Sequence, residues 1–303
     1  MKHRKAFTAV AIALGLVAAA AAAIWHFVWL KPYSVTTAEL QARYAYKEEV
    51  TPGEGHSVEL RLRSFDGELL SGRLVYPSDP ARAARPFPVL LGLHAMGRSH
   101  VRWWHAEFNG RPTREQTHRI TQMALQQGYA VVAIDARAHG QRRHLGQPHA
   151  AQGALRAMHW FGRREAYERM IIDTVRDHRV LLDWLATQPQ LDTRRTAAVG
   201  YSMGAQVALL LAGLDGRVQS VAALVPPHLG DNVAAVAPRS LIAGLQGKRV
   251  WLLTADDDEH ATPEQNQALF DAIPSADKKH LRFGSGHLLP TDYVEQLPGW
   301  LGG

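Results

Sequence analysis

Cysteine is absent from this sequence of 303 residues, and its absence excludes several kinds of chemistry. Without thiols the chain has no disulfide framework, no thiolate nucleophile and no cysteine-ligated zinc site. A lipid anchor attached to cysteine is excluded for the same reason. Glycine and proline are not in excess and 46% of the residues are hydrophobic, so we expect a packed core. The length suits one large α/β domain with a short extension.

Charged residues are also missing from a long stretch near the N-terminus, Ala6 to Leu30, which only His26 interrupts. As a helix this stretch would span about 37 Å at about 1.5 Å per residue, enough to cross a hydrocarbon layer of about 30 Å. We therefore predict a transmembrane signal anchor in residues 1–31, with residues 6–30 in the membrane. The basic residues at positions 2–5 favour a cytoplasmic N-terminus. The expected location is a bacterial inner membrane, with the following domain on the periplasmic or extracytoplasmic side.

A cleaved signal peptide is the alternative, and it would make the protein secreted. The small residues near Ala20–Ala23 offer a processing site. The apolar run continues beyond them, however, and Trp25 and Trp29 suit a membrane interface, which favours the anchor.

The formal net charge is +6, and many of the arginines lie between Arg98 and Arg164. Such a surface fits an acidic substrate, anionic lipid headgroups or simply a solvated arginine-rich face. No nucleic-acid-binding motif accompanies these residues, so we expect a small molecule rather than a nucleic acid as the partner.

Hydrophobic periodicity predicts the architecture. Residues 32–56 form a polar connector with some helix, and alternation in 58–62 and 69–75 around Asp66-Gly67 predicts an antiparallel hairpin. Apolar strands then alternate with amphipathic helices, which indicates a doubly wound, mostly parallel α/β sheet in a domain of residues 57–303. The expected strands are 89–93, 130–134, 196–199, 220–225, 250–253 and 280–283. The expected helices are 114–127, 165–187, 205–214, 263–272 and 293–301. Residues 138–164 lack a core strand and could form a small cap.

Ser202 is the candidate nucleophile. It lies in Gly200-Tyr201-Ser202-Met203-Gly204, between an expected strand and an expected helix, as a nucleophile elbow requires. Side chains at Gly200 and Gly204 would collide with the neighbouring strand and helix. The ordinary alternative is a glycine-flanked serine in a turn, but the strand–turn–helix context favours catalysis.

A serine nucleophile needs a base and an orienting acid. His287 follows the last expected strand on a glycine-rich loop, which singles it out among 16 histidines. The acid is expected after strand 250–253, where four acidic residues are consecutive. Asp258 is our first choice, from its spacing to Pro263, and Asp257 is the second. The alternative for these acids is that they cap the helix beginning at Pro263.

Two backbone N–H groups are expected to form the oxyanion hole. Met203 follows the nucleophile, and Met96 lies in the loop after strand 89–93, where His94 would have a structural role. This chemistry needs no metal and no organic cofactor. A metal site at His139, His144 and His149 is disfavoured because five-residue spacing in a loop is not a ligand signature.

Together these motifs resemble the α/β-hydrolase superfamily, and most of all the dienelactone-hydrolase-like and acyl-peptidase-like esterases. The resemblance covers residues 57–302 and adds the segments Asp135–Gly140 and Asp258–Pro263 to the motifs above. The chain departs from the pattern at Ala95 and Ala205, where the family often has glycine. Dienelactone hydrolases proper use a cysteine nucleophile, so that specific activity is not implied.

The sequence thus predicts a serine hydrolase, foremost a carboxylic ester hydrolase that forms an acyl-enzyme on Ser202. A serine peptidase or amidase of the same fold is the rival enzyme. A membrane-tethered binding protein that has kept the fold without catalysis is the rival from another class, and the complete set of candidate residues disfavours it.

Overall fold

A sheet of eight strands forms the centre of the computed structural model, which describes residues 2–27, 29–46, 59–143 and 149–301. The two pairings that involve β2 are antiparallel, and the other neighbouring strands are parallel. In spatial order the strands are β1 (Glu59–Arg63), β2 (Leu69–Val75), β6 (Ala130–Ile134), β3 (Phe87–Leu93), β7 (Leu191–Tyr201), β8 (Val218–Leu224), β9 (Arg249–Ala255) and β10 (Lys278–Phe283). The predicted mostly parallel α/β sheet is confirmed.

Each central strand sends alternate side chains into two separate cores. In β3, Val89, Leu91 and Leu93 belong to one core, whereas Leu90 belongs to the other. Both faces are buried because helices cover both, which explains why these strands read as nearly continuous apolar runs. The first core lies under α4 (Ala150–Phe161), α5 (Glu165–Ala186), α6 (Met203–Leu214) and α7 (Pro263–Ala272), and the second under α3 (Thr117–Gln126) and α8 (Pro298–Leu301).

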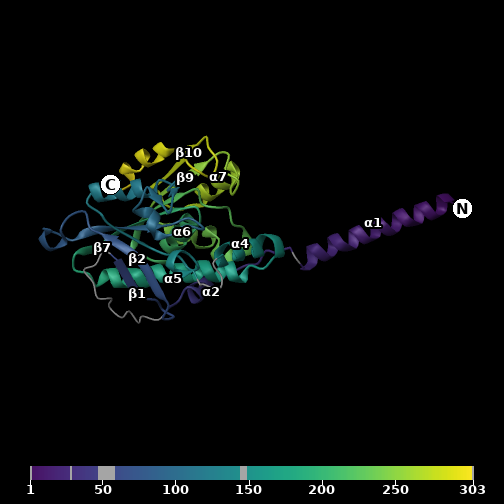
Figure 1. The fold of residues 1–303 in the computed structure, drawn as a ribbon, viewed down its shortest axis with the longest axis horizontal. Coiled ribbons are helices and arrows are strands. Elements are labelled where there is room, and N and C mark those ends of the chain that lie inside the picture. Colours follow the sequence, from purple (N-terminus) through teal and green to yellow (C-terminus); the bar gives the residue numbers. More distant parts are fainter. Residues whose placement is uncertain (1, 28, 47–58, 144–148, 302–303) are drawn as a thin grey trace.

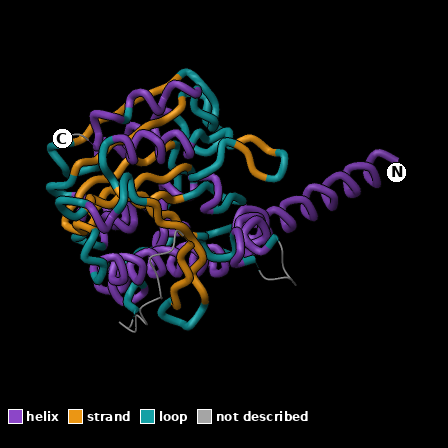
Figure 2. Tube along the Cα trace, turned by 60° about the vertical axis from the view of Figure 1, so that its left-hand side comes forward, coloured by secondary structure: helices purple, strands orange, loops and turns teal. Residues whose placement is uncertain are grey.

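The N-terminal helix α1 (Lys2–Phe27) projects from the rest of the molecule as a single rod (Figures 1 and 2). Of the helices within the described residues, none combines the length and the apolar character needed to cross a membrane. The predicted transmembrane helix is therefore not supported, and the location outside the cytoplasm stays a prediction.

The segment predicted as a connector packs on the domain over its described part, residues 32–46. Its helix α2 (Thr37–Arg43) begins with a capping box, in which the Thr36 hydroxyl and the Glu39 carboxylate each accept a backbone N–H bond. Leu40 and Tyr44 are fully buried, and the Tyr44 hydroxyl donates to the carbonyl of Ala235 at 2.8 Å.

The structure departs from the prediction mainly in short elements. The expected last helix, 293–301, is broken into η6 (Thr291–Gln296) and α8, because Pro298 has no N–H with which to continue a helix. The sequence does not predict several short elements. They are η1 (Pro80–Arg82), η2 (His100–Trp103), η3 (Gly140–Arg142), η4 (Asp231–Val236), η5 (Pro238–Leu245) and the small hairpin of β4 (Glu107–Phe108) and β5 (Arg111–Pro112). The segment proposed as a cap contains η3 and α4.

Candidate active site

Ser202 occupies a strained turn between the end of β7 and the start of α6. Its backbone has φ 55° and ψ −117°, a region that non-glycine residues rarely adopt. Its N–H donates to the carbonyl of Leu224 in β8 at 2.8 Å, which ties the turn to the neighbouring strand. The turn therefore lifts the serine side chain at the carboxyl end of the sheet, where a bound molecule can reach it.

The two glycines of the motif are there because the backbones approach closely. A Cβ at Gly200 would overlap the carbonyl of Gly204, and one at Gly204 would overlap the carbonyl of Leu93. Neither neighbour is a side chain that could move aside, so the sequence motif follows from the geometry of the turn.

His287 lies on the loop after β10, and its ring reaches Ser202. Its Nε2 is 2.8 Å from the Ser202 hydroxyl oxygen. The Tyr201 hydroxyl holds this loop in place, because it donates to the carbonyl of His287 and accepts from the N–H of Leu289, both at 2.9 Å. Tyr201, the residue before Ser202, thus positions the loop that carries His287.

Asp258 meets the other nitrogen of the same imidazole. Its two carboxylate oxygens lie 2.9 and 3.0 Å from His287 Nδ1, and its side chain is almost completely buried. Burial works to raise the pKa of this carboxyl, but hydrogen bonds from His287 and from the N–H of His260 outweigh it and hold the pKa below its usual value. Asp258 is therefore a carboxylate that fixes the ring and leaves Nε2 to face the serine.

The neighbouring acids have other environments. Asp256 pairs with Arg282 on the surface at 2.8 Å, and Asp257 is exposed. Helix α7 is capped by the hydroxyl of Thr262. The structure thus brings Ser202 and His287 together with the first-choice acid and not with the second.

Met203 and Met96 both line the cavity above Ser202. Met203 is the first residue of α6, so its N–H has no acceptor within the helix. His94 anchors the loop of Met96, since its Nε2 accepts from the N–H of Ala136 at 3.0 Å and its Nδ1 is 2.9 Å from the carbonyl of Ala95. Burial lowers the pKa of His94 to about 4, so the ring is neutral and structural, as expected.

The cavity at Ser202 has a volume of about 700 Å³, in the range of small-molecule sites. Leu155 of α4, Leu229 and Leu288 give it an apolar side. Arg98 and Glu115 give it a polar side, where Arg98 Nε lies 2.5 Å from a Glu115 carboxylate oxygen. The second oxygen of the Glu115 carboxylate is buried and has no hydrogen-bond partner within the described residues.

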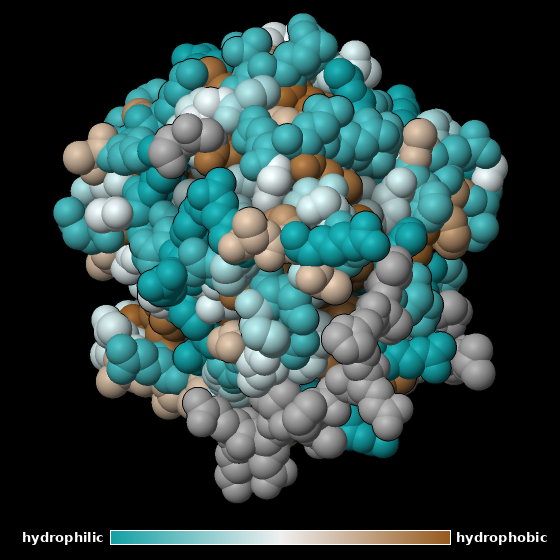
Figure 3. Space-filling view, turned by 90° about the vertical axis from the view of Figure 1, so that its left-hand side faces the viewer, coloured by the Kyte–Doolittle hydropathy of each residue, from teal (hydrophilic) through white to brown (hydrophobic). Residues whose placement is uncertain are grey.

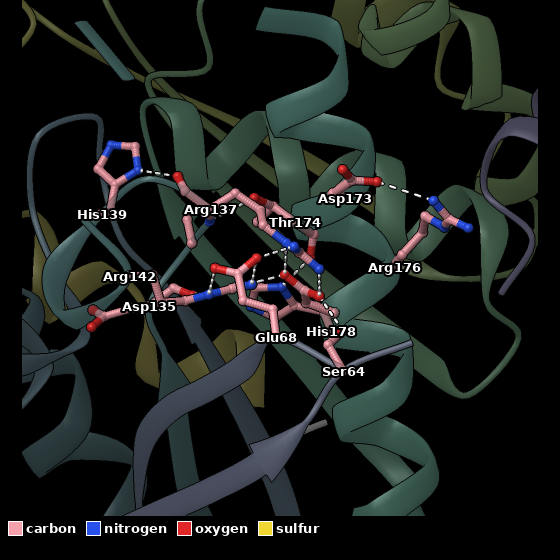
Figure 4. A network of polar contacts seen from close by, with 12 residues as sticks. Ser64, Glu68, Asp135, Arg137, His139, Arg142, Asp173, Thr174, Arg176 and His178 are labelled. Carbon is pink, nitrogen blue, oxygen red and sulfur yellow. Dashed lines mark hydrogen bonds and ion pairs between the residues drawn. The ribbon is translucent and has the colours of Figure 1, made fainter. Parts of the chain in front are cut away.

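A network of charged groups braces the loop after β6 (Figure 4). Arg137 contacts the carboxylates of Asp177, Asp66 and Glu68, and Arg142 donates to Asp177 at 2.6 Å. The partners come from α5 and from the turn between β1 and β2, so the network joins three elements.

Three further contacts at the site carry no signal in the sequence: the Tyr201 bridge, the Arg98–Glu115 pair, and His260, whose ring meets that of His287 edge-on at 4.5 Å. Each depends on how loops far apart in the chain fold together. In the described residues no cluster of three or more potential metal ligands occurs, and His144 lies outside them.

Comparison with known proteins places these features in a family. The sequence profile of the dienelactone hydrolase family matches residues 106–282, more than half of the chain. Thiohydrolase apmlB of Arthrinium phaeospermum is 36% identical over 81 residues, which span 26% of either chain. The match thus covers about a quarter of that curated relative.

Solved esterases share the fold. Acetyl xylan esterase 1 from Thermoanaerobacterium sp. superposes with a TM-score of 0.63 at 16% identity, over 92% of this chain and 96% of the other. A cold-adapted esterase from an Arctic intertidal metagenomic library superposes with a TM-score of 0.58 at 18% identity, over 84% and 99%. At such identities the likeness concerns the fold alone.

Proposed function

The chain belongs to the dienelactone hydrolase family, and we propose that it is a serine hydrolase that cleaves carboxylic esters through an acyl-enzyme on Ser202. The observation that carries the proposal is the continuous series of contacts from the Ser202 hydroxyl through both nitrogens of His287 to Asp258. This arrangement can remove a proton from the serine as the oxygen attacks a carbonyl carbon.

In the proposed reaction, His287 accepts the Ser202 proton through Nε2 and then gives it to the departing alcohol oxygen. The acyl group remains on Ser202 as an ester. Water then gives a proton to His287 and attacks that ester, which releases the carboxylic acid and restores the serine hydroxyl. Asp258 stabilises the imidazolium formed in each half of the reaction.

The carbonyl oxygen acquires negative charge in both steps. The backbone N–H groups of Met203 and Met96 are the proposed donors to it, and the N-terminus of α6 adds a favourable dipole. Loss of one such donor typically lowers turnover by about 10²–10³-fold.

Two comparisons favour ester substrates. Several solved proteins with this fold are named esterases, and the curated relative is named a thiohydrolase.

Labelling with a fluorophosphonate tests the proposal. The wild-type protein should gain the mass of one phosphonyl group on the peptide that contains Ser202, because only an activated serine reacts with this reagent. Ser202→Ala should remain unlabelled, and His287→Ala should label far more slowly. A folded wild-type sample that stays unlabelled, or one labelled at another serine, would contradict the proposal and favour a non-catalytic binding protein.

A further inference from the structure

A second cavity of about 480 Å³ adjoins the one that contains Ser202. The two share His159, His228 and Leu229 in their linings, so they lie side by side at these residues. The second cavity lies between the C-terminal end of α1, helix α4 and the loop that leads into η4. We call it the side groove, and its remaining lining residues are Ile24, Trp29, Leu30, Met158, Trp160, Gly230, Asn232 and Val233.

The walls of the side groove are mainly apolar. Trp29 and Trp160 are 61% and 73% exposed, which is unusual for the largest apolar side chains. Of the other exposed large apolar residues in the described chain, Ile24 and Trp25 near the end of α1 and Phe161 of α4 lie in the same region. The rest lie along the projecting part of α1 (Ile12, Leu14, Leu16 and Val17), beside His287 (Leu288) and elsewhere on the domain (Leu69 and Phe108). The face of the molecule turned away from α1 is predominantly hydrophilic (Figure 3).

The chain segment that follows α1 is bound to the residues on the other side of the side groove. Arg164 donates to the carbonyls of Lys31 and Asn232 at 3.0 and 2.8 Å, and its guanidinium lies over the ring of Tyr33. The N–H of Tyr33 also donates to the carbonyl of Asp231 at 3.0 Å. These contacts hold both sides of the side groove at a set separation.

One apolar wall of the Ser202 cavity leads toward the side groove. Leu229 lines both cavities, and Leu155 of α4 lies one helical turn before His159, which also lines both. An apolar chain attached to the Ser202 oxygen can therefore extend along these residues toward Trp29 and Trp160.

We propose that the side groove binds the distal part of a long, unbranched acyl chain, so that the substrates are esters of medium- to long-chain fatty acids. This inference rests on the proposed function and specifies its substrate. Each methylene buried in such a groove should improve kcat/KM by about fourfold, the equivalent of about 0.8 kcal/mol, until the groove is full.

Chain-length profiles of the full-length protein test the inference. Wild type should hydrolyse p-nitrophenyl dodecanoate with a higher kcat/KM than the butyrate. Trp29→Ala combined with Trp160→Ala should lower kcat/KM for the dodecanoate about tenfold and leave the butyrate within about twofold. Asn232→Trp, which adds bulk inside the groove, should have the same selective effect. Leu69→Ala, an exposed apolar residue in β2, is the matched control and should change neither.

Two results would overturn the inference while the proposed function stands. One is hydrolysis of short esters by wild type with no gain for longer chains. The other is an equal loss for both chain lengths in the tryptophan variants. If these variants instead lose binding to phosphatidylethanolamine–phosphatidylglycerol vesicles and keep the chain-length profile, the surface contacts lipid and the inference is wrong. Absence of any ester hydrolysis by wild type would contradict the proposed function itself.

Discussion

At the scale of single residues, the orientation of His287 depends on which of the consecutive acidic residues contacts its ring. Asp258 receives the imidazole N–H and a backbone N–H, whereas Asp256 pairs with Arg282 and Asp257 is exposed. We predict that Asp258→Asn lowers kcat for a short ester by about 10²–10⁴-fold, because an amide cannot stabilise the imidazolium and favours the wrong tautomer. Steady-state kinetics on p-nitrophenyl butyrate would measure the loss.

Asp257→Asn is the matched control, since it makes the same chemical change one position away. Its activity should stay within about twofold of wild type. A large loss in Asp257→Asn together with near-normal activity in Asp258→Asn would refute the assignment.

The individual site residues differ in how far the sequence could identify them. Ser202 and His287 follow strands in a fixed order, and Asp258 was the preferred acid from its spacing to Pro263. Tyr201 and His260 depend on contacts between the elbow and two loops that are distant in sequence. No periodicity or motif reports such contacts, so only the folded chain reveals them.

At the scale of secondary structure, the small helix α2 joins the N-terminal segment to the domain. We predict that Tyr44→Ala lowers the free energy of unfolding by about 3–5 kcal/mol, because it empties a fully buried aromatic site and removes the bond to Ala235. Urea denaturation would measure this change.

Gln41→Ala alters an exposed residue of the same helix and should change the unfolding free energy by less than about 0.5 kcal/mol. Tyr44→Phe should cost about 1–3 kcal/mol, since it leaves the carbonyl of Ala235 without its donor. Equal stability of Tyr44→Ala and Gln41→Ala would mean that α2 contributes little to the domain.

The long elements were predictable because their periodicity is strong. Strands such as β6 and helices such as α5 and α7 lie within a few residues of their expected ranges. The turns of η4 and η5 have no repeating apolar pattern, and their conformation is set by packing, of η5 on α6 and of η4 on α5 and η5. Pro298 indicates the break in the last helix, but the apolar residues around it also fit one continuous helix.

At the scale of the whole molecule, buried neutral histidines should set its sensitivity to acid. Burial lowers the pKa of His94 to about 4 and that of His139 to about 3, and it also lowers the pKa of His178. In the unfolded chain these groups would titrate near pH 6.5. Between about pH 6.5 and pH 4 the unfolded state therefore binds more protons, so stability falls as the pH decreases.

We expect His94 and His139 each to contribute a slope of up to about 1.4 kcal/mol per pH unit in that window. Urea denaturation from pH 7 to pH 4.5 would measure the slope. His139→Asn should reduce the slope by the contribution of one histidine. His105→Asn, at an exposed position, should leave the slope unchanged. An unfolding free energy that is constant over this range would show that the histidines are not neutral and buried.

The central proposal for the whole molecule is an acyl-enzyme at Ser202, and hydrolysis of p-nitrophenyl butyrate by wild type and Ser202→Ala tests this proposal most directly. The alanine variant should fold with the same circular dichroism and lose at least about 10³-fold in kcat, since the nucleophilic oxygen is gone. A folded Ser202→Ala protein that hydrolyses the ester as fast as wild type would contradict the account.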